Sequence, residues 1–371
     1  MDTLNFGLIG SGFMGKTHVF GISLADRVFD LPCRLELLKI ADASEEMAYR
    51  AAKELGVSSY ASDWRELIED DNLDVINITT PNSCHTEMAA AAIKAGKHVY
   101  CEKPLAVSAD DAYFLADLAR KASIKTQVGF NYLCNPMIIK AREMVLDGQL
   151  GEIRGFRGIH AEDYMADANS PYTWRHDLLG GGALVDLGSH IIATAEFLLG
   201  PITDVMGYCS TSIKRRLDET GSSKLVEVDD VSRAFLKFKN GATGSLEANW
   251  LATGRKMQHE FEVFGTEGAL HFSQERLNEI SFYKVGDPVG QRGFKTIFAG
   301  PEHEPYERFC VAPGHQLGFA DLKAIEVKGF VEAITGVGDE PFNFSAGARI
   351  QALVELIIRS SKDKNWKAVD F

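Results

Sequence analysis

Three glycines near the start of the chain constrain its fold more than any other feature. Gly10, Gly12 and Gly15 have the G-x-G-x-x-G spacing in GLIGSGFMG, after an apolar run and before a segment that can form a helix. The first glycine permits a tight turn, the second lets a pyrophosphate approach the backbone, and the third lets helix and strand pack closely. The helix that follows offers its N–H groups to the phosphates. The motif therefore predicts a dinucleotide-binding turn, and the alternative is a structural turn without a ligand.

Strand-like and helical segments alternate through residues 1–128. Apolar runs at 5–10, 35–42, 74–80, 97–101 and 125–130 alternate with helical patterns at 15–26, 44–56, 83–95 and 108–123. Gly56 is expected to end one helix, and Ser108 to cap the start of another. This alternation predicts an α/β domain with a parallel, doubly wound sheet.

The pattern changes in residues 129–371. Helices are expected at 136–147 and 184–199, followed by strand-like runs joined by short turns at 240–241 and 265–268. Hairpins without intervening helices predict an antiparallel sheet, so the second domain is expected to be α+β. Two further helices are expected at 318–336 and 347–361, and they could pack on the first domain. The basic stretch IKRRLDE around Lys214 is interpreted as a solvated turn.

The charge balance argues against nucleic acid and membrane partners. The chain carries 52 acidic and 39 basic residues, a formal net charge of -13. Such a surface repels phosphate backbones and anionic lipids. The first residues lack a basic region ahead of a long apolar core, and no apolar run is long enough to span a bilayer. With six dispersed cysteines and no CxxC pair, these features favour a cytoplasmic protein with reduced thiols.

Asp42 follows the second predicted strand and indicates which dinucleotide is bound. Its carboxylate is placed to accept hydrogen bonds from the adenosine ribose diol, and it would repel the 2′-phosphate of NADP. The DASEE segment supplies no arginine to offset that charge. NAD is therefore the expected cofactor. Asp42 could also, or instead, cap the helix that begins near Ser44.

Polar side chains collect where the third and fourth strands of the predicted sheet end. Thr80, Asn82 and His85 follow the third strand, and Glu102 and Lys103 follow the fourth. Ligands of doubly wound sheets bind outside these carboxyl ends. A lysine ammonium there can orient a substrate hydroxyl and stabilise a developing alkoxide. The alternative is a surface ion pair that precedes a loop.

Asp186 and His190 lie four residues apart on a predicted helix and therefore on one face. A histidine beside a carboxylate is a common pairing for proton transfer near neutral pH. From spacing alone, a helix-surface pair or a core histidine with its hydrogen bonds satisfied would be favoured. A metal site built from His176, Asp186 and His190 is conceivable but lacks a recognisable ligand motif, so no metal is expected.

Four motifs together resemble the glucose–fructose oxidoreductase/inositol dehydrogenase/MocA family. They are the glycine motif at 10–15, TPNSCH at 80–85, EKP at 102–104 and WRHDLLGGGALVDLGSH at 174–190. The resemblance implies a Rossmann domain and a second domain with an open antiparallel sheet that commonly forms homodimers or homotetramers. It also implies that Lys103, Asp186 and His190 are the catalytic residues.

Within that family, GFNYLCNP and AEDYMAD are most similar to segments of levoglucosan and inositol dehydrogenases. By this resemblance, the substrate and nicotinamide pocket is lined by Asn131, Tyr132, Asp163, Tyr164, Trp174 and Arg175. The full set expected to bind the cofactor is Gly10, Gly12, Phe13, Met14, Gly15, Asp42, Thr80, Asn82, His85, Glu102, Lys103, Asn131, Trp174 and Arg175. The set expected to bind substrate is Lys103, Asn131, Tyr132, Asp163, Tyr164, His176, Asp186, His190 and His315.

These features predict an NAD-dependent dehydrogenase that oxidises a secondary ring hydroxyl of a neutral cyclic polyol or sugar to a ketone. An anionic substrate normally needs a second, bidentate cation, and the expected pocket segments offer only Arg175. Tyr132 and Leu133 replace an arginine-containing sequence of many family members, so the substrate class stays open. Two rival functions are a redox-assisted glycosidase that retains NAD and a non-catalytic NAD-binding sensor, which would be expected to lack one of the three catalytic residues.

Overall fold

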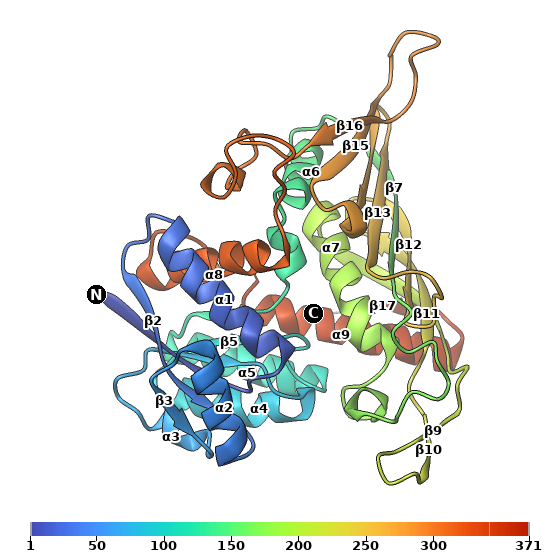
Figure 1. The fold of residues 1–371 in the computed structure, drawn as a ribbon. Coiled ribbons are helices and arrows are strands. Elements are labelled where there is room, and N and C mark those ends of the chain that lie inside the picture. The colour runs from blue at the N-terminus through green and yellow to red at the C-terminus, as the bar shows by residue number, and fades with distance from the viewer. Residues whose placement is uncertain (1, 341, 370–371) are drawn as a thin grey trace. The chain divides into compact units, whose positions relative to one another are not determined.

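The computed structural model describes residues 2–340 and 342–369. The chain divides into two compact units, each built from two segments. The first unit comprises Met1–Cys134 and Gly318–Gln351, and the second comprises Asn135–Leu317 and Ala352–Phe371. Figure 1 follows the chain through both units by colour. The domain boundaries 1–128 and 129–371 stay a prediction.

The first unit contains a six-stranded sheet in which every pair of neighbouring strands is parallel. Its strand order is β3-β2-β1-β4-β5-β6. The strands are β1 (Thr3–Ile9), β2 (Arg34–Ala41), β3 (Ser59–Ala61), β4 (Val75–Ile78), β5 (His98–Cys101) and β6 (Thr126–Val128). The helices are α1 (Phe13–Val28), α2 (Glu45–Leu55), α3 (Arg65–Ile68), α4 (His85–Lys94), α5 (Ala109–Ala122) and α8 (Phe319–Thr335), with short 3-10 turns η1 (Asn82–Cys84) and η2 (Asn131–Cys134).

This architecture confirms the predicted doubly wound sheet, with one strand missed. Five strands were expected, and β3 is the sixth; its three residues are too few to show a hydrophobic pattern. The predicted helix ends are confirmed at two places. Gly56 ends α2 with φ of 72°, and the Ser108 hydroxyl accepts a hydrogen bond from the Asp111 N–H at 3.1 Å.

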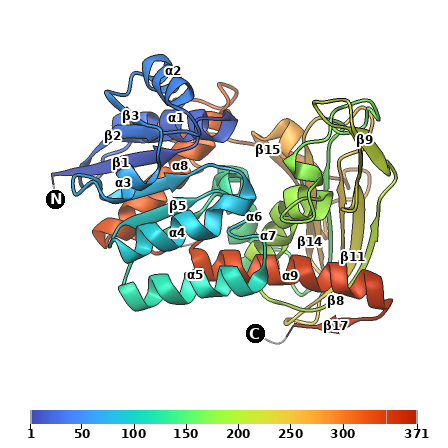
Figure 2. The same cartoon turned by 90° about the horizontal axis from the view of Figure 1, so that it is seen from below.

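Helices cover both faces of this sheet. Figure 2 shows α1 and α8 together on one face, and α4 and α5 on the other. Buried apolar side chains of β1, β2, α1 and α2 form one core between sheet and helices, including Leu8, Val19, Ile40 and Ala51. Because both faces are covered, only the strand ends are left open to a ligand.

The second unit contains a nine-stranded sheet of order β16-β15-β14-β13-β7-β12-β11-β8-β17. Its strands are β7 (Ile153–Ala161), β8 (Ile202–Ser210), β11 (Val231–Phe238), β12 (Thr243–Asn249), β13 (Gln258–Gly265), β14 (Gly268–Ser273), β15 (Glu279–Lys284), β16 (Lys295–Phe298) and β17 (Lys367–Ala368). A separate hairpin pairs β9 (Arg215–Leu217) with β10 (Ser223–Leu225). The helices are α6 (Pro136–Leu146), α7 (Ser189–Leu199) and, from Ala352 on, α9 (Phe344–Asp363), with shorter turns η3 (Trp174–His176), η4 (Leu184–Gly188), η5 (Gln274–Arg276) and η6 (Tyr306–Arg308).

The large sheet is antiparallel as predicted, except that β7 and β12 run parallel to each other. The hairpin between β11 and β12 is confirmed, with Gly241 at φ of 89° in its turn. Helix α7 packs on β7 and β12, so one sheet face is buried. Along β11 buried and exposed side chains alternate, which leaves the opposite face open.

The interpretation of IKRRLDE as a solvated turn is wrong for its central arginine. Arg216 is only 2% exposed, and its guanidinium donates to the carbonyl oxygens of Met165, Asp167 and Ser170. The basic side chain therefore fixes the loop that follows Tyr164. Local charge density could not reveal this, because the partners lie far away in the sequence.

Among the described residues, no helix combines the length and the apolar composition needed to cross a bilayer. Within the same residues, no group of three or more His, Cys, Asp or Glu side chains is arranged to hold a metal ion.

Candidate active site

The glycine turn has the geometry that a dinucleotide requires. Gly10 has φ of 91°, and a Cβ on Gly15 would lie 2.2 Å from the Gly10 carbonyl oxygen, so both positions exclude larger residues. A Cβ on Gly12 would meet no atom within 4 Å. Gly12 is also the N-cap of α1, so open space lies where a pyrophosphate would meet the helix N-terminus. The turn has the steric features that NAD binding requires, and the contacts of the three glycines with the cofactor stay a prediction.

Asp42 faces the glycine turn at the end of β2. Its carboxylate accepts hydrogen bonds from the Ser11 backbone N–H at 2.8 Å and from the Ser11 hydroxyl. The alternative that Asp42 caps helix α2 is wrong, because the Ser44 hydroxyl accepts the hydrogen bond from the Met47 N–H. Asp42 thus stays available for a ribose diol.

Two other predicted cofactor residues begin helix α1. Phe13 is 73% exposed and stacks on Phe319 of α8, with ring centroids 5.8 Å apart. Tyr132 is buried and lies against the same phenylalanine at 6.1 Å. Met14 lies beside Phe13 in the first turn of α1. Helix α8 thus meets the glycine turn through aromatic contacts that the sequence did not reveal.

His85 connects the two loops at the carboxyl ends of β4 and β5. It is fully buried, with Nδ1 2.8 Å from the Pro104 carbonyl oxygen and Nε2 2.9 Å from the Thr80 carbonyl oxygen. Burial lowers the pKa of its imidazole. Because both ring nitrogens lie against backbone carbonyl oxygens, His85 links these two loops, and its contact with the cofactor stays a prediction. Asn82 between them is also buried.

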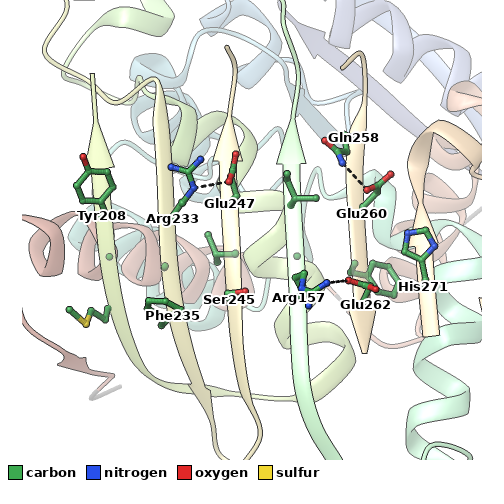
Figure 3. Close-up of a pocket in the computed structure, with 17 residues that line it drawn as sticks. Arg157, Tyr208, Arg233, Phe235, Ser245, Glu247, Gln258, Glu260, Glu262 and His271 are labelled. Carbon is green, nitrogen blue, oxygen red and sulfur yellow. Dashed lines mark hydrogen bonds and ion pairs between the residues drawn. The ribbon is translucent and has the colours of Figure 1, made fainter. Parts of the chain in front are cut away.

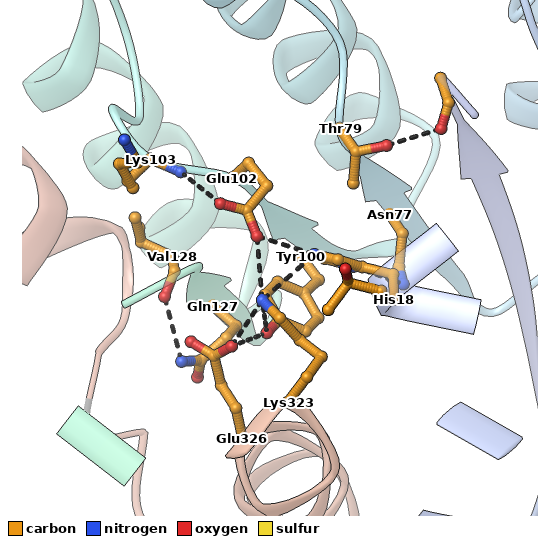
Figure 4. Close-up of polar contacts among 12 residues, drawn as sticks. His18, Asn77, Thr79, Tyr100, Glu102, Lys103, Gln127, Val128, Lys323 and Glu326 are labelled. Atoms are coloured by element: carbon orange, nitrogen blue, oxygen red, sulfur yellow. Dashed lines mark hydrogen bonds and ion pairs between the residues drawn. The ribbon is translucent and has the colours of Figure 1, made fainter. Parts of the chain in front are cut away.

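Glu102 and Lys103 are not an exposed ion pair, so that alternative is wrong. Glu102 is 5% exposed, and its Oε1 lies 2.9 Å from Lys323 Nζ and 2.9 Å from His18 Nε2 (Figure 4). Burial by itself would raise the pKa of Glu102, but the Lys323 ammonium and the His18 hydrogen bond hold it well below its usual range. Lys103 is half-buried beside it, and its backbone N–H donates to Glu102 Oε2 at 3.3 Å.

Asn131 follows β6 in the same unit. It is 2% exposed, and its Nδ2 is a buried donor without a hydrogen-bond partner among the described residues. An amide in that state is available to a bound molecule, since an unsatisfied buried donor is unfavourable.

In the second unit, Asp186 lies in a π-helical turn and not in the regular α-helix expected at 184–199. This turn, η4, precedes α7, which carries His190. Such insertions are frequent at functional sites. Asp186 Oδ2 accepts hydrogen bonds from the Tyr164 hydroxyl and from Arg175 Nε at 3.3 Å. Burial and the Asp186 charge raise the pKa of Tyr164, which keeps its hydroxyl protonated as a donor.

His190 is 7% exposed and belongs to a cluster of three histidines. Its ring centroid lies 5.5 Å from that of His160 and 6.4 Å from that of His259. His259 is fully buried, and burial holds its pKa well below the usual range, so it is neutral. His160 and His259 had no predicted role, because they come from separate strands.

Asp163 has a cationic partner that the sequence analysis missed. Lys256 Nζ lies 2.8 Å and 2.7 Å from the two Asp163 carboxylate oxygens, and the Gly254 N–H donates to one of them at 2.9 Å. The expectation that Arg175 is the only additional cation near the pocket is therefore wrong, because Lys256 is a second one. Nothing in the local sequence marked Lys256, since it lies 93 residues from Asp163.

The remaining predicted residues of this unit differ in burial. His176 is 1% exposed, its Nδ1 accepts from the Thr173 N–H at 2.9 Å, and its ring lies 5.8 Å from that of Trp250. Trp174 and Arg175 stack, with the guanidinium carbon 4.3 Å from the ring centroid. His315, by contrast, lies exposed on the loop before Leu317.

These features define an NAD-binding oxidoreductase, and comparison with known proteins agrees. A model of the oxidoreductase family with an NAD-binding Rossmann fold matches residues 4–130, and one of the GFO/IDH/MocA C-terminal domain matches 138–271. The chain belongs to the glucose–fructose oxidoreductase/inositol dehydrogenase/MocA family. It is an NAD-dependent dehydrogenase acting on CH–OH groups, in keeping with its named relatives.

Several relatives cover most or all of the chain. Levoglucosan dehydrogenase from Pseudarthrobacter phenanthrenivorans is 36% identical over 99% of this chain and 98% of its own length. Myo-inositol 2-dehydrogenase from Thermotoga maritima is 26% identical over 80% of this chain and 82% of its own. The solved complex of levoglucosan dehydrogenase with NADH and L-sorbose has a TM-score of 0.97, with 100% of both chains covered. An NAD-binding oxidoreductase from Klebsiella pneumoniae is 41% identical, with a TM-score of 0.95 and 100% of both chains covered.

Proposed function

We propose that this dehydrogenase oxidises a secondary ring hydroxyl of a neutral cyclic polyol or sugar to a ketone. The observation that carries the proposal is the full-length similarity to levoglucosan dehydrogenase, at 36% identity and a TM-score of 0.97. Relatives named as inositol dehydrogenases extend the class to cyclic polyols. The chain retains EKP and D-x-x-x-H, which supply a cation, a base and a carboxylate for this chemistry.

In the proposed mechanism, the Lys103 ammonium donates a hydrogen bond to the substrate hydroxyl oxygen and favours its deprotonation. His190 accepts the hydroxyl proton as general base. Bound NAD+ would supply the two-electron oxidant: with the proton on His190, loss of a hydride from the carbon that bears the hydroxyl would convert the alcohol to a ketone. Asp186 stabilises the charge that His190 acquires.

The Asp163–Lys256 pair supports a neutral substrate. The carboxylate and the ammonium neutralise each other, so neither presents an unbalanced charge to a ligand. Both can hydrogen-bond to hydroxyl groups, with the carboxylate accepting and the ammonium donating. Because Lys256 balances its charge, Asp163 does not by itself repel anions, and the pair suits hydroxyl-bearing substrates.

The test is NADH formation, followed by absorbance, across levoglucosan, inositols, aldoses, glycosides, a uronate and a sugar phosphate. We expect turnover with a neutral cyclic compound, and product NMR should show a ring ketone and no lactone. A higher kcat/KM for the phosphate or the uronate would overturn the proposal. Hydrolysis of a glycoside without net NADH release would instead identify a redox-assisted glycosidase.

We also propose that the open face of the large sheet binds a second copy of this chain, giving a homodimer or homotetramer. Figure 3 shows this face, where Arg157 pairs with Glu262 at 2.7 Å and Arg233 with Glu247 at 2.7 Å. Beside the Arg233–Glu247 pair, Phe235 of the same strand and Tyr208 of the neighbouring strand are each 61% exposed (Figure 3). A surface that mixes aromatic residues with charges of both signs can pair with itself. Light scattering should give a dimer or tetramer, and Phe235→Arg should give a monomer; a monomeric wild type would refute this.

A further inference from the structure

Helix α8 carries a lysine that is completely buried in the first unit. Lys323 is 0% exposed, and its ammonium reaches three oxygen atoms. They are Glu102 Oε1 at 2.9 Å, Glu326 Oε2 at 2.7 Å and the Tyr100 hydroxyl at 3.0 Å (Figure 4). The three N–H bonds of the ammonium therefore each have an acceptor. None of the motifs that identify the family includes Lys323.

His18 joins the same cluster from the cofactor-binding helix α1. Its Nδ1 lies 3.1 Å from Asn77 Nδ2, so this nitrogen accepts, and Nε2–H then donates to Glu102 at 2.9 Å. Burial, followed by the Lys323 charge, lowers the pKa of His18 to about 4, in agreement with a neutral ring. The Glu102 carboxylate is thus held by one cation and one neutral donor.

Two glycines make room for the cluster. A Cβ on Gly21 of α1 would lie 2.6 Å from Lys323 Cγ, and a Cβ on Gly129 would lie 2.5 Å from Glu102 Oε1. Larger residues at these positions would displace the lysine stem or the carboxylate. The close approach of α1 and α8, and of the segment after β6 to Glu102, therefore shapes the cluster.

Stability alone does not explain such a cluster. Burying an ion pair brings a desolvation penalty that often equals or exceeds its attraction, so apolar side chains of similar size can stabilise a fold as well. Its position suggests another role, since Glu102 directly precedes Lys103. The second carboxylate oxygen, Oε2, accepts from the Lys103 backbone N–H at 3.3 Å. The orientation of Glu102 is thereby coupled to the backbone that carries the Lys103 side chain.

We propose that Lys323 is a positioning residue for Lys103 and acts through the Glu102 carboxylate. It holds that carboxylate away from the Lys103 side chain, so that Glu102 does not compete with a substrate hydroxyl for the Lys103 ammonium (Figure 4). This inference rests on the proposed catalytic role of Lys103. Without Lys323, Glu102 would lose its buried cation, and the adjacent Lys103 would be its nearest replacement. Pairing with Glu102 would withdraw the Lys103 ammonium from the substrate.

The first test is Lys323→Met, which keeps the volume and removes the charge. The rate at which an amine-reactive acylating reagent labels Lys103, measured by peptide mass spectrometry at mildly alkaline pH, should fall by about threefold or more. This readout needs no substrate.

NAD binding to Lys323→Met, followed by fluorescence quenching, should change by less than about twofold, because the glycine turn and Asp42 are intact. In the NADH assay with levoglucosan or myo-inositol, kcat should fall by about tenfold with KM little changed.

The matched control is Lys97→Met. Lys97 is a second buried lysine of the same unit, 6% exposed, and its Nζ donates to the Asp70 and Leu73 carbonyl oxygens at 2.8 Å. This variant should lose stability without altering Lys103 labelling. Equal changes in labelling for the two variants, or none in Lys323→Met, would overturn the inference.

Glu102→Gln provides a second variant if Lys323→Met does not fold. The glutamine retains the shape and removes the carboxylate that could pair with Lys103, while Lys323 keeps Glu326. Lys103 labelling should therefore not fall in Glu102→Gln, and a fall of about threefold or more would overturn the inference. Lys103→Ala separates the two proposals. Full turnover of Lys103→Ala would refute the proposed function. Loss of turnover in Lys103→Ala but not in Lys323→Met would refute only the positioning role.

Discussion

Each unit holds one predicted ligand-binding carboxylate, and the two are held in different ways. In the first unit, the Glu102 side chain is 7% exposed and its partner Lys323 is 0% exposed. In the second, Asp163 is 19% exposed and its partner Lys256 is 75% exposed. Water screens the second pair and weakens it, whereas the first pair cannot exchange partners without leaving a buried charge. The first unit therefore has a fixed arrangement, and the second has polar groups that can exchange partners with substrate hydroxyls.

The largest expected effect comes from removing the proposed catalytic groups. Lys103→Ala or His190→Ala should lower kcat by about a hundredfold or more, as is typical for lost acid–base groups. NAD binding, measured by fluorescence quenching, should survive His190→Ala, because the glycine turn and Asp42 lie in the other unit. Wild-type turnover of His190→Ala near neutral pH would refute its role as the base.

Acidification should destabilise the buried arrangement. The folded pKa of His18 is about 4, against 6.5 for an exposed histidine, so the unfolded chain binds a proton between these values and the folded chain does not. The free energy of unfolding therefore keeps its full contribution from His18 above pH 6.5. It falls by about 3 kcal/mol as the pH drops from about 6.5 to about 4. The lowered pKa of Glu102 acts in the same direction at lower pH. Urea unfolding at several pH values measures this loss.

The matched variant for the acid effect is His18→Gln, which removes the titrating group but keeps an amide donor. Its stability should be lower at neutral pH and should change less between about pH 6.5 and about pH 4. An identical pH slope in the variant and the wild type would show that His18 is not the source of the acid sensitivity.

Cofactor preference gives a smaller effect within the first unit. Asp42→Ala should weaken NAD and narrow its advantage over NADP by about tenfold, because the ribose acceptor and the repulsive charge are lost together. Dissociation constants for both cofactors measure this. If both affinities stay at wild-type values, Asp42 does not select the cofactor.

The smallest effect is expected at the exposed pair. Lys256→Ala should leave the unfolding transition unchanged and alter kcat/KM for a neutral substrate by no more than about fivefold, as exposed ion pairs contribute little. The same variant should improve discrimination against a uronate, since Asp163 would then carry an uncompensated charge. A loss of stability as large as that of Lys323→Met would remove the contrast between the two units.

Much of the fold and part of the site followed from local sequence. Hydrophobic periodicity gave the alternating elements of the first unit and the hairpins of the second, because it depends on neighbours within one element. The short strand β3 and the parallel pairing of β7 with β12 were missed, since neither leaves a local pattern. The π-helical turn at Asp186 was missed for the same reason.

The sequence by itself determined the residues whose role depends on close neighbours. Gly10, Gly12 and Gly15 build a turn from adjacent residues, and Asp42 lies where its strand ends. Glu102 was different, because its partner Lys323 lies 221 residues away on α8. Only the packing of that helix against α1 decided that this carboxylate is buried and paired with Lys323. Charge pairing in a folded core depends on distance in space, which tertiary packing sets and sequence spacing does not record.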